Sequence, residues 1–246
     1  MTRTIRWGIL GCGDVTEVKS GPGFAKAKDS ELGAVMRRDA EKAQDYARRH
    51  DVPRWYSDAQ QLIDDPEVDA IYVATRPDTH RDYAERCAEA GKVTLLEKPM
   101  ARTAEEAQAI VDAFRRSGTS LYCAFYRRAL PRFVRAKELI AEGRIGDVRC
   151  IQVTHMLPEP APDFDSDGLP WRYEPSIGGG GLFVDMGAHE IDLLDYFLGP
   201  VKKARGLAMN QAGRYPAEDG VAATFTFESH AYAVGLWCYT AHDRED

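Results

Sequence analysis

The chain has 246 residues, of which 44% are hydrophobic and 29% charged, and its formal net charge is −7 at pH 7. This length and composition indicate an ordinary globular protein with one large or two modest domains. Acidic and basic residues are mixed without a basic stripe, and no apolar run is long enough to span a bilayer. Neither nucleic acid nor a membrane is therefore expected as a partner.

The cysteines and the amino terminus bear on the cellular compartment. The five cysteines are scattered and odd in number, and none forms a CxxC pair. Such usage is typical of reduced thiols rather than of a disulfide framework or a thiolate zinc site. The first residues lead directly into a strand and lack the apolar core of a signal peptide. These features favour a cytoplasmic protein.

The first half of the chain alternates predicted strands and helices. Apolar runs indicate buried strands at residues 5–10, 31–36, 70–74, 93–96 and 121–125. Between them, Asp39 and Asp78 precede helical patterns, and Thr103 with Glu106 forms a capping box. The Ser-Gly-Pro-Gly segment at residues 20–23 interrupts the first helical segment, so this helix should be short or broken. The alternation predicts a Rossmann-type α/β fold with a parallel, doubly wound sheet.

The pattern changes after about residue 125. A helix is predicted after Pro131, and a second helix carries Asp185 and His189 to about Leu198. Strands are predicted at residues 148–156, 203–209, 221–227 and 232–239, and a Pro- and Asp-rich loop at 157–175. Strands joined by short turns indicate an open, largely antiparallel or mixed sheet with one covered face. The sequence thus predicts two α/β domains, at residues 1–125 and 126–246.

A glycine loop follows the first strand, in the order Gly11-Cys12-Gly13-Asp14-Val15. Gly11 permits the tight turn, Gly13 lets the backbone approach a pyrophosphate, and the start of the next helix supplies N–H groups. Thr16 occupies the place of the third glycine, and an ordinary strand-to-helix turn is the alternative interpretation. The position of the loop in a repeated βαβ pattern favours a dinucleotide site.

Two arginines, Arg37 and Arg38, stand at the end of the second strand, where NAD sites usually carry an acid for the ribose 2′-hydroxyl. They suit the 2′-phosphate of NADP, which carries about −1.5 to −2 charges near neutral pH. The alternative is a solvated pair beside the capping residue Asp39. We expect NADP as the cofactor, with NAD as the second choice.

Two further segments carry candidate chemical groups. Lys98 follows Glu97 at a strand end, where open α/β sheets bind ligands, although a salt bridge between strand and helix is the alternative. Asp185 and His189 are four residues apart, which would place them on one helix face. Their alternative is a capping aspartate and a satisfied core histidine. The glycine run at 178–181 would let another backbone or a ligand come close.

A metal site is a further interpretation of the same segment, since Asp185, His189 and Glu190 all offer ligand atoms. The zincin pattern needs a second histidine, and Leu193 stands in its place. No metal is therefore expected.

Together these residues resemble the Gfo/Idh/MocA oxidoreductases, a family named for glucose–fructose oxidoreductase and inositol dehydrogenase. The resemblance covers the whole chain and rests on motifs that occur in order along it. They are Trp7-Gly8-Ile9-Leu10-Gly11-Cys12-Gly13, Ala74-Thr75-Arg76-Pro77 with His80, Gly91-Lys92 before Glu97-Lys98-Pro99, Trp171-Arg172, and Gly179-Gly180-Gly181 with Asp185, Gly187 and His189.

The resemblance implies an amino-terminal Rossmann domain and a carboxy-terminal α/β domain whose open sheet forms a dimer or tetramer interface. It implies that Lys98, Asp185 and His189 act at the substrate. The positions that it places around the cofactor are the glycine loop, the end of the second strand, Thr75, His80, Glu97, Lys98 and Arg172.

Two features depart from the family pattern. Arg37 stands where many members carry an acid, which puts NAD in doubt. The chain ends at Asp246, just after a predicted strand, whereas similar proteins are longer. The second domain is therefore expected to lack its carboxy-terminal strands.

The last predicted strand bears on the quaternary state. Trp237 and Tyr239 alternate with Leu236 and Cys238. One face should therefore meet the helices and the other face a second subunit.

We therefore expect an NADP-dependent oxidoreductase that transfers a hydride between the nicotinamide and a hydroxyl or carbonyl of a sugar, polyol or similar small molecule. His189 would exchange the hydroxyl proton, Lys98 would polarise the oxygen, and Asp185 would orient the imidazole or contact the substrate. A non-catalytic nucleotide-sensing protein of the same fold is the main alternative, and a metal hydrolase is third.

Overall fold

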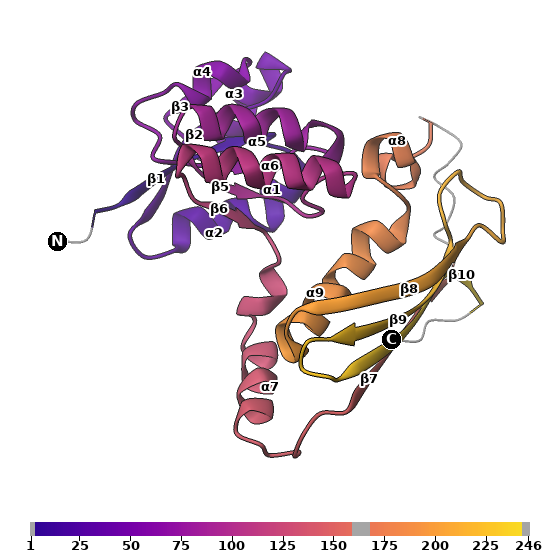
Figure 1. Cartoon of the computed structure of the whole chain (residues 1–246). Coiled ribbons are helices and arrows are strands. Elements are labelled where there is room, and N and C mark those ends of the chain that lie inside the picture. Colours follow the sequence, from indigo (N-terminus) through magenta and orange to yellow (C-terminus); the bar gives the residue numbers. More distant parts are fainter. Residues whose placement is uncertain (1–2, 159–167, 243–246) are drawn as a thin grey trace. The chain divides into compact units, whose positions relative to one another are not determined.

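The computed structural model of the protein describes residues 3–158 and 168–242 (Figure 1). The chain divides into two compact units, Met1–Ala124 and Phe125–Asp246. In the described ranges, no helix is long and apolar enough to cross a membrane. Part of the predicted loop at 157–175 lies outside the described residues.

The first unit contains a parallel sheet whose strands, in the described part of the chain, have the order β3-β2-β1-β4-β5-β6. The strands are β1 (Ile5–Leu10), β2 (Ser30–Met36), β3 (Arg54–Tyr56), β4 (Ala70–Val73), β5 (Val93–Leu96) and β6 (Leu121–Cys123). The helices are α1 (Asp14–Val18), α2 (Gly21–Lys26), α3 (Ala40–Arg49), α4 (Ala59–Ile63), α5 (His80–Glu89) and α6 (Ala104–Ser117), and η1 (Pro77–Thr79) is a 3-10 turn. The predicted doubly wound sheet is confirmed.

The helix boundaries follow the capping residues. The side chain of Asp39 accepts a hydrogen bond from the Lys42 amide over 3.1 Å at the start of α3. Thr103 accepts from the Glu106 amide over 3.2 Å at the start of α6. The predicted break in the first helix is also confirmed, because α1 and α2 are separate short helices.

Both faces of this sheet are buried. Neighbouring residues of β1 point to opposite faces, Leu10 into a core formed with α4, α5 and α6, and Ile9 into one formed with α3. Tyr72 and Val73 of β4 divide in the same way. Burial on both faces explains why these strands are continuous apolar runs in the sequence.

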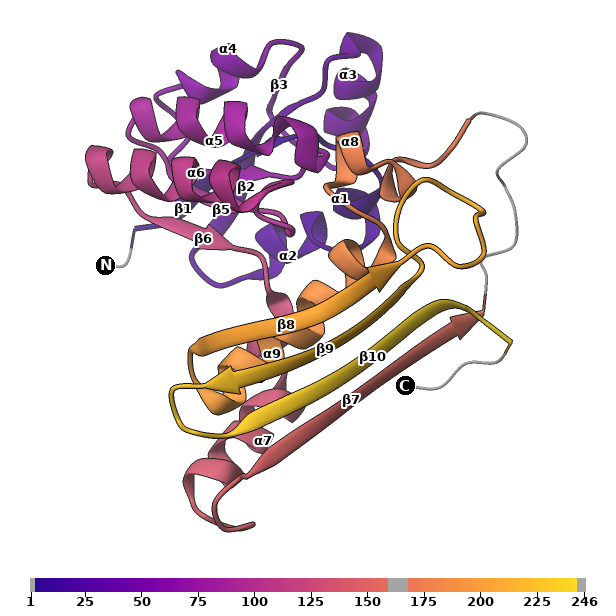
Figure 2. The same ribbon diagram turned by 45° about the vertical axis from the view of Figure 1, so that its right-hand side comes forward.

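The second unit contains a mixed sheet with the order β7-β10-β9-β8 among its described residues (Figure 2). Its strands are β7 (Cys150–Pro158), β8 (Val201–Met209), β9 (Gly220–Phe227) and β10 (Tyr232–Ala241). Only the β7–β10 pair is parallel within this described sheet. The helical segments are η2 (Tyr126–Ala129), α7 (Pro131–Ala141), η3 (Trp171–Tyr173), α8 (Pro175–Gly178), a π-helical turn η4 (Phe183–Gly187) and α9 (Ala188–Leu198).

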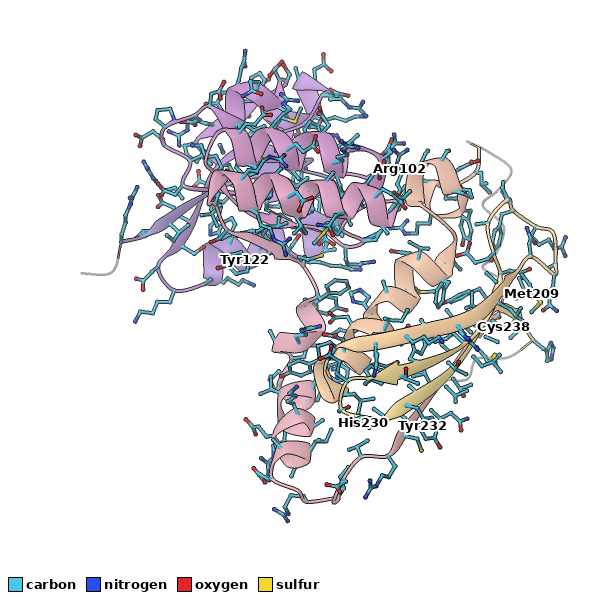
Figure 3. The ribbon with its side chains drawn as sticks, in the orientation of Figure 1. Arg102, Tyr122, Met209, His230, Tyr232 and Cys238 are labelled. Carbon is cyan, nitrogen blue, oxygen red and sulfur yellow. The ribbon has the colours of Figure 1, made fainter. Side chains whose placement is uncertain are left out.

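The two faces of this second sheet differ in burial. Trp237 and Tyr239 of β10 point into the core beneath α9 and are 1% and 0% exposed. Leu236, between them, is 46% exposed and faces the other side with Tyr232. Exposed apolar side chains of β8 and β10 share that outer face, as the register shows; they are Leu207, Met209, Tyr232, Val234 and Leu236. Met209 and Tyr232 are labelled in Figure 3. We call this surface the open sheet face.

Candidate functional site

Four segments that the sequence singled out meet at the carboxyl edge of the first sheet. Parallel strands end at the same edge, and each segment directly follows β1, β2, β4 or β5. Main-chain hydrogen bonds join them: Gly11 N donates to Met36 O over 2.9 Å, and Glu97 N donates to Val73 O over 3.0 Å. This edge of an open α/β sheet is where ligands bind.

The glycine loop needs its first glycine for two reasons. Gly11 has φ +91°, a left-handed conformation that other residues rarely adopt. A Cβ there would also lie 2.6 Å from the side chain of Thr75. At Gly13 the nearest atom to a Cβ is 3.9 Å away, so space remains open beside this stretch of backbone. The amides of Asp14 and Val15 open α1, where N–H groups have no partner within a helix.

Thr16, at the place of the missing third glycine, closes the turn internally. Its side chain is completely buried. The hydroxyl donates to Gly13 O over 2.8 Å and accepts from Gly13 N over 3.0 Å. The threonine therefore fixes the loop through its own side chain, and a glycine pattern alone does not reveal this.

Arg37 lies against the glycine loop. Its guanidinium donates to Cys12 O over 3.3 Å, and its amide donates to Tyr56 O over 3.2 Å. Arg37 is half-buried, whereas its neighbour Arg38 is exposed. A guanidinium has five N–H donors, so Arg37 keeps donors for a ligand while one binds the loop. Burial raises the pKa of the Cys12 thiol to about 11, so this cysteine is protonated near neutral pH.

Glu97 and Lys98 follow β5 and are both half-buried. The Glu97 carboxylate accepts hydrogen bonds from the Tyr72 hydroxyl and, over 3.0 Å, from the Lys98 amide. Burial, reinforced by this carboxylate, raises the pKa of Tyr72. Glu97 therefore anchors the start of the segment that presents Lys98.

His80 is the first residue of α5 and is completely buried. Its Nδ1 lies 2.9 Å from Pro99 O, and its Nε2 lies 3.0 Å from Thr75 O. The side chain therefore lies between two of the segments at the sheet edge. Because the His80 side chain has no exposed surface, it can influence a ligand only by positioning these two segments.

Asp185 and His189 lie in the second unit, in two different helical turns. Asp185 belongs to the π-helical turn η4, and His189 belongs to the first turn of α9. The predicted continuous α-helix is therefore wrong at its start. Glycine is needed at position 187 of this turn, because a Cβ there would lie 2.6 Å from the ring of Phe183. Single π-helical turns are frequent at functional sites.

The surroundings of these two side chains differ. His189 is 6% exposed, and the rings of Phe125 and Tyr126 contact it edge-on, with centroids 6.0 and 5.3 Å away. Asp185 forms an ion pair with Arg172, whose Nε is 3.2 Å from Oδ2. The Arg172 guanidinium also stacks on Trp171, 4.6 Å from the ring centroid. The Trp-Arg motif thus positions a cation at the Asp185 carboxylate.

The glycine run before Asp185 admits another segment of the chain. A Cβ on Gly181 would lie 2.6 Å from Glu218 O and 2.9 Å from the Cβ of Ala217. The Gly181 amide donates to the Glu218 carboxylate over 2.8 Å. Of the two interpretations that the sequence left open, these contacts favour a close backbone.

A polar cluster behind α9 has no signal in the local sequence. Arg127 pairs with Glu190 over 2.7 Å, and His155 of β7 lies 3.5 Å from the same carboxylate. Tyr239 packs edge-on against His155, with ring centroids 5.6 Å apart. Arg128 is held by Asp192 at 2.7 Å and Asp195 at 2.9 Å. These pairs join β7, η2 and α9, and they fix the helix that carries His189.

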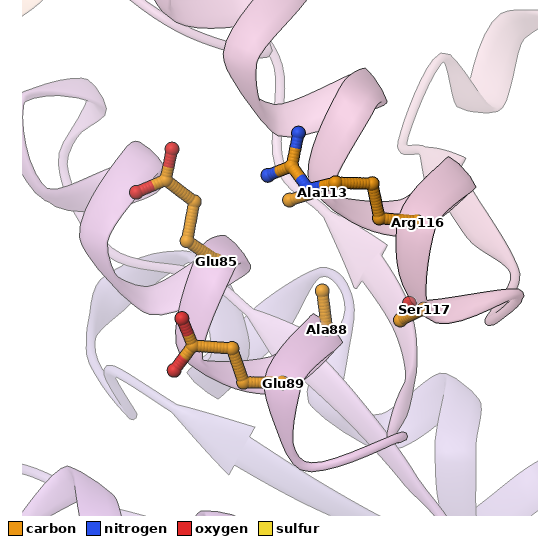
Figure 4. Close-up of a pocket in the computed structure, with 6 residues that line it drawn as sticks. All are labelled: Glu85, Ala88, Glu89, Ala113, Arg116 and Ser117. Carbon is orange, nitrogen blue, oxygen red and sulfur yellow. The ribbon is translucent and has the colours of Figure 1, made fainter.

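One hollow of about 430 Å³ lies away from all these groups, between the carboxyl-terminal halves of α5 and α6 (Figure 4). Its lining residues are Glu85, Ala88, Glu89, Ala113, Arg116 and Ser117. Helices run opposite to the strands, so this hollow lies toward the amino edge of the sheet and has no part in the nucleotide loop. In the described ranges, no cluster of three or more His, Cys, Asp or Glu residues is arranged to hold a metal ion.

Known family patterns match most of the chain. The oxidoreductase family with an NAD-binding Rossmann fold matches residues 5–125. The GFO/IDH/MocA C-terminal domain matches residues 133–246.

Individual proteins are similar to this chain over most of its length. Oxidoreductase P35 of Formosa agariphila is 37% identical, over 100% of this chain and 76% of its own. The 1,5-anhydro-D-fructose reductase of Ensifer adhaerens is 31% identical, over 93% of this chain and 67% of its own. The structure of levoglucosan dehydrogenase in complex with NADH and levoglucosan superposes with a TM-score of 0.86 and 27% identity, over 98% of this chain and 69% of that one.

Proposed function

Because this chain belongs to the Gfo/Idh/MocA family of NAD-binding oxidoreductases, we propose that it oxidises a hydroxyl or reduces a carbonyl of a sugar or polyol, with NADP(H) as its preferred cofactor. The observation that carries the proposal is the meeting of the glycine loop, Arg37, Thr75 and Lys98 at one sheet edge. Within the second unit, the pairing of Arg172 with Asp185 supports a role for the segment that carries Asp185 and His189.

The residues at the sheet edge fit a dinucleotide. The open space at Gly13 and the amides of Asp14 and Val15 suit a pyrophosphate. Thr75 follows β4, the strand next to β1, and Glu97 follows β5, one strand further along the same edge. His80 belongs to the same group through the two carbonyls that it contacts. Arg172 is the candidate cofactor contact in the second unit. When bound, the nicotinamide would accept or supply the hydride.

Arg37 and Arg38 support the preference for NADP. Charge-assisted hydrogen bonds contribute about 1.5–3 kcal/mol each. One such bond to the 2′-phosphate would favour NADP over NAD by roughly 10- to 150-fold. NAD remains the second choice, since the solved structure described above contains NADH.

Three side chains take the chemical roles. His189 would exchange the proton of the substrate hydroxyl, since histidine is the side chain that most often acts as a general acid or base. Lys98 would donate to the substrate oxygen and polarise it. Asp185, held by Arg172, would contact the substrate or orient the imidazole. The rings of Phe125 and Tyr126 restrict the motion of His189.

A sugar or polyol is supported by the names of the relatives. One is a 1,5-anhydro-D-fructose reductase, and the similar solved structure holds levoglucosan. We further propose a cytoplasmic homo-oligomer. The apolar side chains of the open sheet face, 40–64% exposed in the single chain, would be covered by a second subunit.

The direct test is a screen of neutral sugars, polyols and aromatic diols with NADP⁺ and with NAD⁺, followed at the absorbance of the reduced nicotinamide. Turnover of at least one substrate that is lost in His189→Ala is the expected result. Binding of NADPH without turnover of any substrate in either direction would instead favour the non-catalytic alternative.

A further inference from the structure

We propose that His80 is a positioning residue that fixes the Lys98 segment relative to the segment after β4, and so sets the distance between the lysine and the nucleotide loop. Only the expected change in kcat rests on the proposed function, because it alone requires a turnover measurement. Its structural part stands on the contacts of this side chain within the first unit.

The contacts form a continuous path. Thr75 packs against the glycine loop, since a Cβ on Gly11 would lie 2.6 Å from its side chain and 3.1 Å from its amide nitrogen. The carbonyl of Thr75 lies 3.0 Å from Nε2 of His80. On the other side, Nδ1 lies 2.9 Å from the carbonyl of Pro99, the second residue after Glu97. The His80 ring therefore contacts both the segment that packs against Gly11 and the segment that carries Lys98.

The helix behind the ring makes the connection stiff. His80 is 0% exposed, and residues of the same helix, Ala84 and Cys87, are also fully buried in the core below the sheet edge. The buried ring therefore extends from a helix that is itself anchored in this core. Thr79, next to it, adds a second tie, because its hydroxyl donates to the Thr75 hydroxyl over 2.8 Å.

The two contacts of the ring can be tested one at a time, because they use different ring nitrogens. Burial lowers the pKa of His80, so the ring is neutral near pH 7. A neutral imidazole carries one N–H and donates to one carbonyl at a time. An asparagine amide at this position takes the place of Nδ1 and reaches Pro99 O alone. A glutamine amide takes the place of Nε2 and reaches Thr75 O alone.

The experiment compares His80→Asn and His80→Gln with the unmodified chain, by hydrogen exchange of residues 74–79 and 97–102 and by NADPH affinity. If the N–H is on Nε2, His80→Asn should speed exchange in 74–79 alone and weaken NADPH binding, while His80→Gln should leave both unchanged. If the N–H is on Nδ1, His80→Gln should speed exchange in 97–102 alone, leave NADPH affinity unchanged and lower kcat, while His80→Asn should change none of these. The effect should be roughly 2- to 13-fold, the contribution of one hydrogen bond. A response in one variant alone is therefore the expected result, and it assigns the N–H to the carbonyl that this variant no longer reaches.

Cys87→Ala is the matched control, because it truncates a buried side chain on the same helix, two turns on, without touching either carbonyl. It should lower the melting temperature without selective exchange in either segment. The proposal is overturned if both His80 variants loosen both segments equally, if neither loosens either segment, or if they behave like Cys87→Ala. Hydrogen exchange needs no substrate, so failure of the proposed oxidoreductase activity remains distinguishable from failure of this inference.

Discussion

The guanidinium of Arg37 donates a hydrogen bond to the main-chain carbonyl of Cys12 over 3.3 Å. This contact brings the cation at the end of β2 onto the glycine loop, beside the site proposed for the dinucleotide. Cys12 is 1% exposed, so the carbonyl that accepts the bond belongs to a buried part of the loop. Arg38, the next residue, is exposed.

Arg37→Asp should reverse or narrow the cofactor preference. The unmodified protein should bind NADPH more tightly than NADH, by roughly 10- to 150-fold if one charge-assisted bond is made to the 2′-phosphate. An aspartate would repel that phosphate and accept from a ribose hydroxyl. Fluorescence titration with both reduced cofactors measures the ratio. Arg116→Asp, an equal charge change at the hollow away from the loop, should leave it unchanged. Equal affinities for the two cofactors in the unmodified protein would contradict the assignment.

Leu236→Arg should weaken the proposed subunit contact. The side chain is 46% exposed at the centre of the open sheet face, and Ala222 of β9 lies opposite it in the register. Two copies of an arginine at a twofold interface would bury unpaired charge. Light scattering at micromolar concentration should show a dimer or larger assembly for the unmodified protein and a smaller mass for the variant.

Ile145→Arg serves as the control for this measurement. Ile145 is 69% exposed but lies between α7 and β7, outside the strands β8 and β10 that form the open sheet face. Its substitution should leave the mass unchanged. A monomer in the unmodified protein would remove the open sheet face as the interface.

Asp69→Asn should lower stability at neutral pH but not in acid. Hydrogen bonds from Arg6, together with the charges of Arg3 and Arg6, lower the pKa of Asp69 to about 2. A carboxyl group with a lowered pKa stabilises the fold above its unfolded pKa of about 3.9, and the contribution is lost as the pH falls through about 2. The expected cost of the substitution at pH 7 is about 2 kcal/mol.

Thermal unfolding between pH 2 and 7 measures this effect. The curves of Asp69→Asn and the unmodified protein should converge towards pH 2. Asp112→Asn removes a 43% exposed partner of Arg115 on α6 and should change stability little at any pH. A difference for Asp69→Asn that is the same at pH 2 and pH 7 would show that the charge is not its cause.

The first unit could be predicted closely because its information is local. Its buried parallel strands are uninterrupted apolar runs, and Asp39 and Thr103 cap helices where the pattern places them. The short elements were missed. The strand Arg54–Tyr56 and the helix Ala59–Ile63 span less than the windows over which periodicity is detectable. Asp78 does precede α5, but the residue at the N-cap is Thr79, and Asp78 lies in the 3-10 turn before it.

The candidate site was less predictable because its partners come from distant segments. The ion pair between Arg172 and Asp185 depends on how the chain between them folds. The same holds for the hydrogen bond from the Gly181 amide to Glu218. The motif spacing located Asp185 and His189 but could not show the π-helical turn, in which the ring of Phe183 packs against Gly187. The two carbonyls that flank His80 are likewise main-chain atoms, which no side-chain pattern records.

His189→Ala should separate a catalytic from a structural histidine. General acid–base groups contribute roughly 10²–10⁴-fold to rate, which is about 3–5.5 kcal/mol of barrier. The variant should therefore lose at least about 100-fold in kcat, with the Kd for NADPH nearly unchanged, because the glycine loop belongs to the first unit. Asp185→Asn should lose less if its role is to orient the imidazole. Lys98→Ala should affect both kcat and NADPH affinity, since its segment follows β5 at the edge that carries the loop.

A structural role for His189 predicts the opposite pattern. The ring is 6% exposed and packs against Phe125 and Tyr126, so truncation would lower the melting temperature in either case. Turnover per folded molecule distinguishes the two roles, because removal of a purely structural histidine would leave this turnover nearly unchanged. His230→Asn, at an exposed turn where φ is +68°, is the control and should change neither quantity. Melting temperature, NADPH affinity and kcat should be measured on the same preparation, and a destabilised but fully active His189→Ala would end the catalytic assignment.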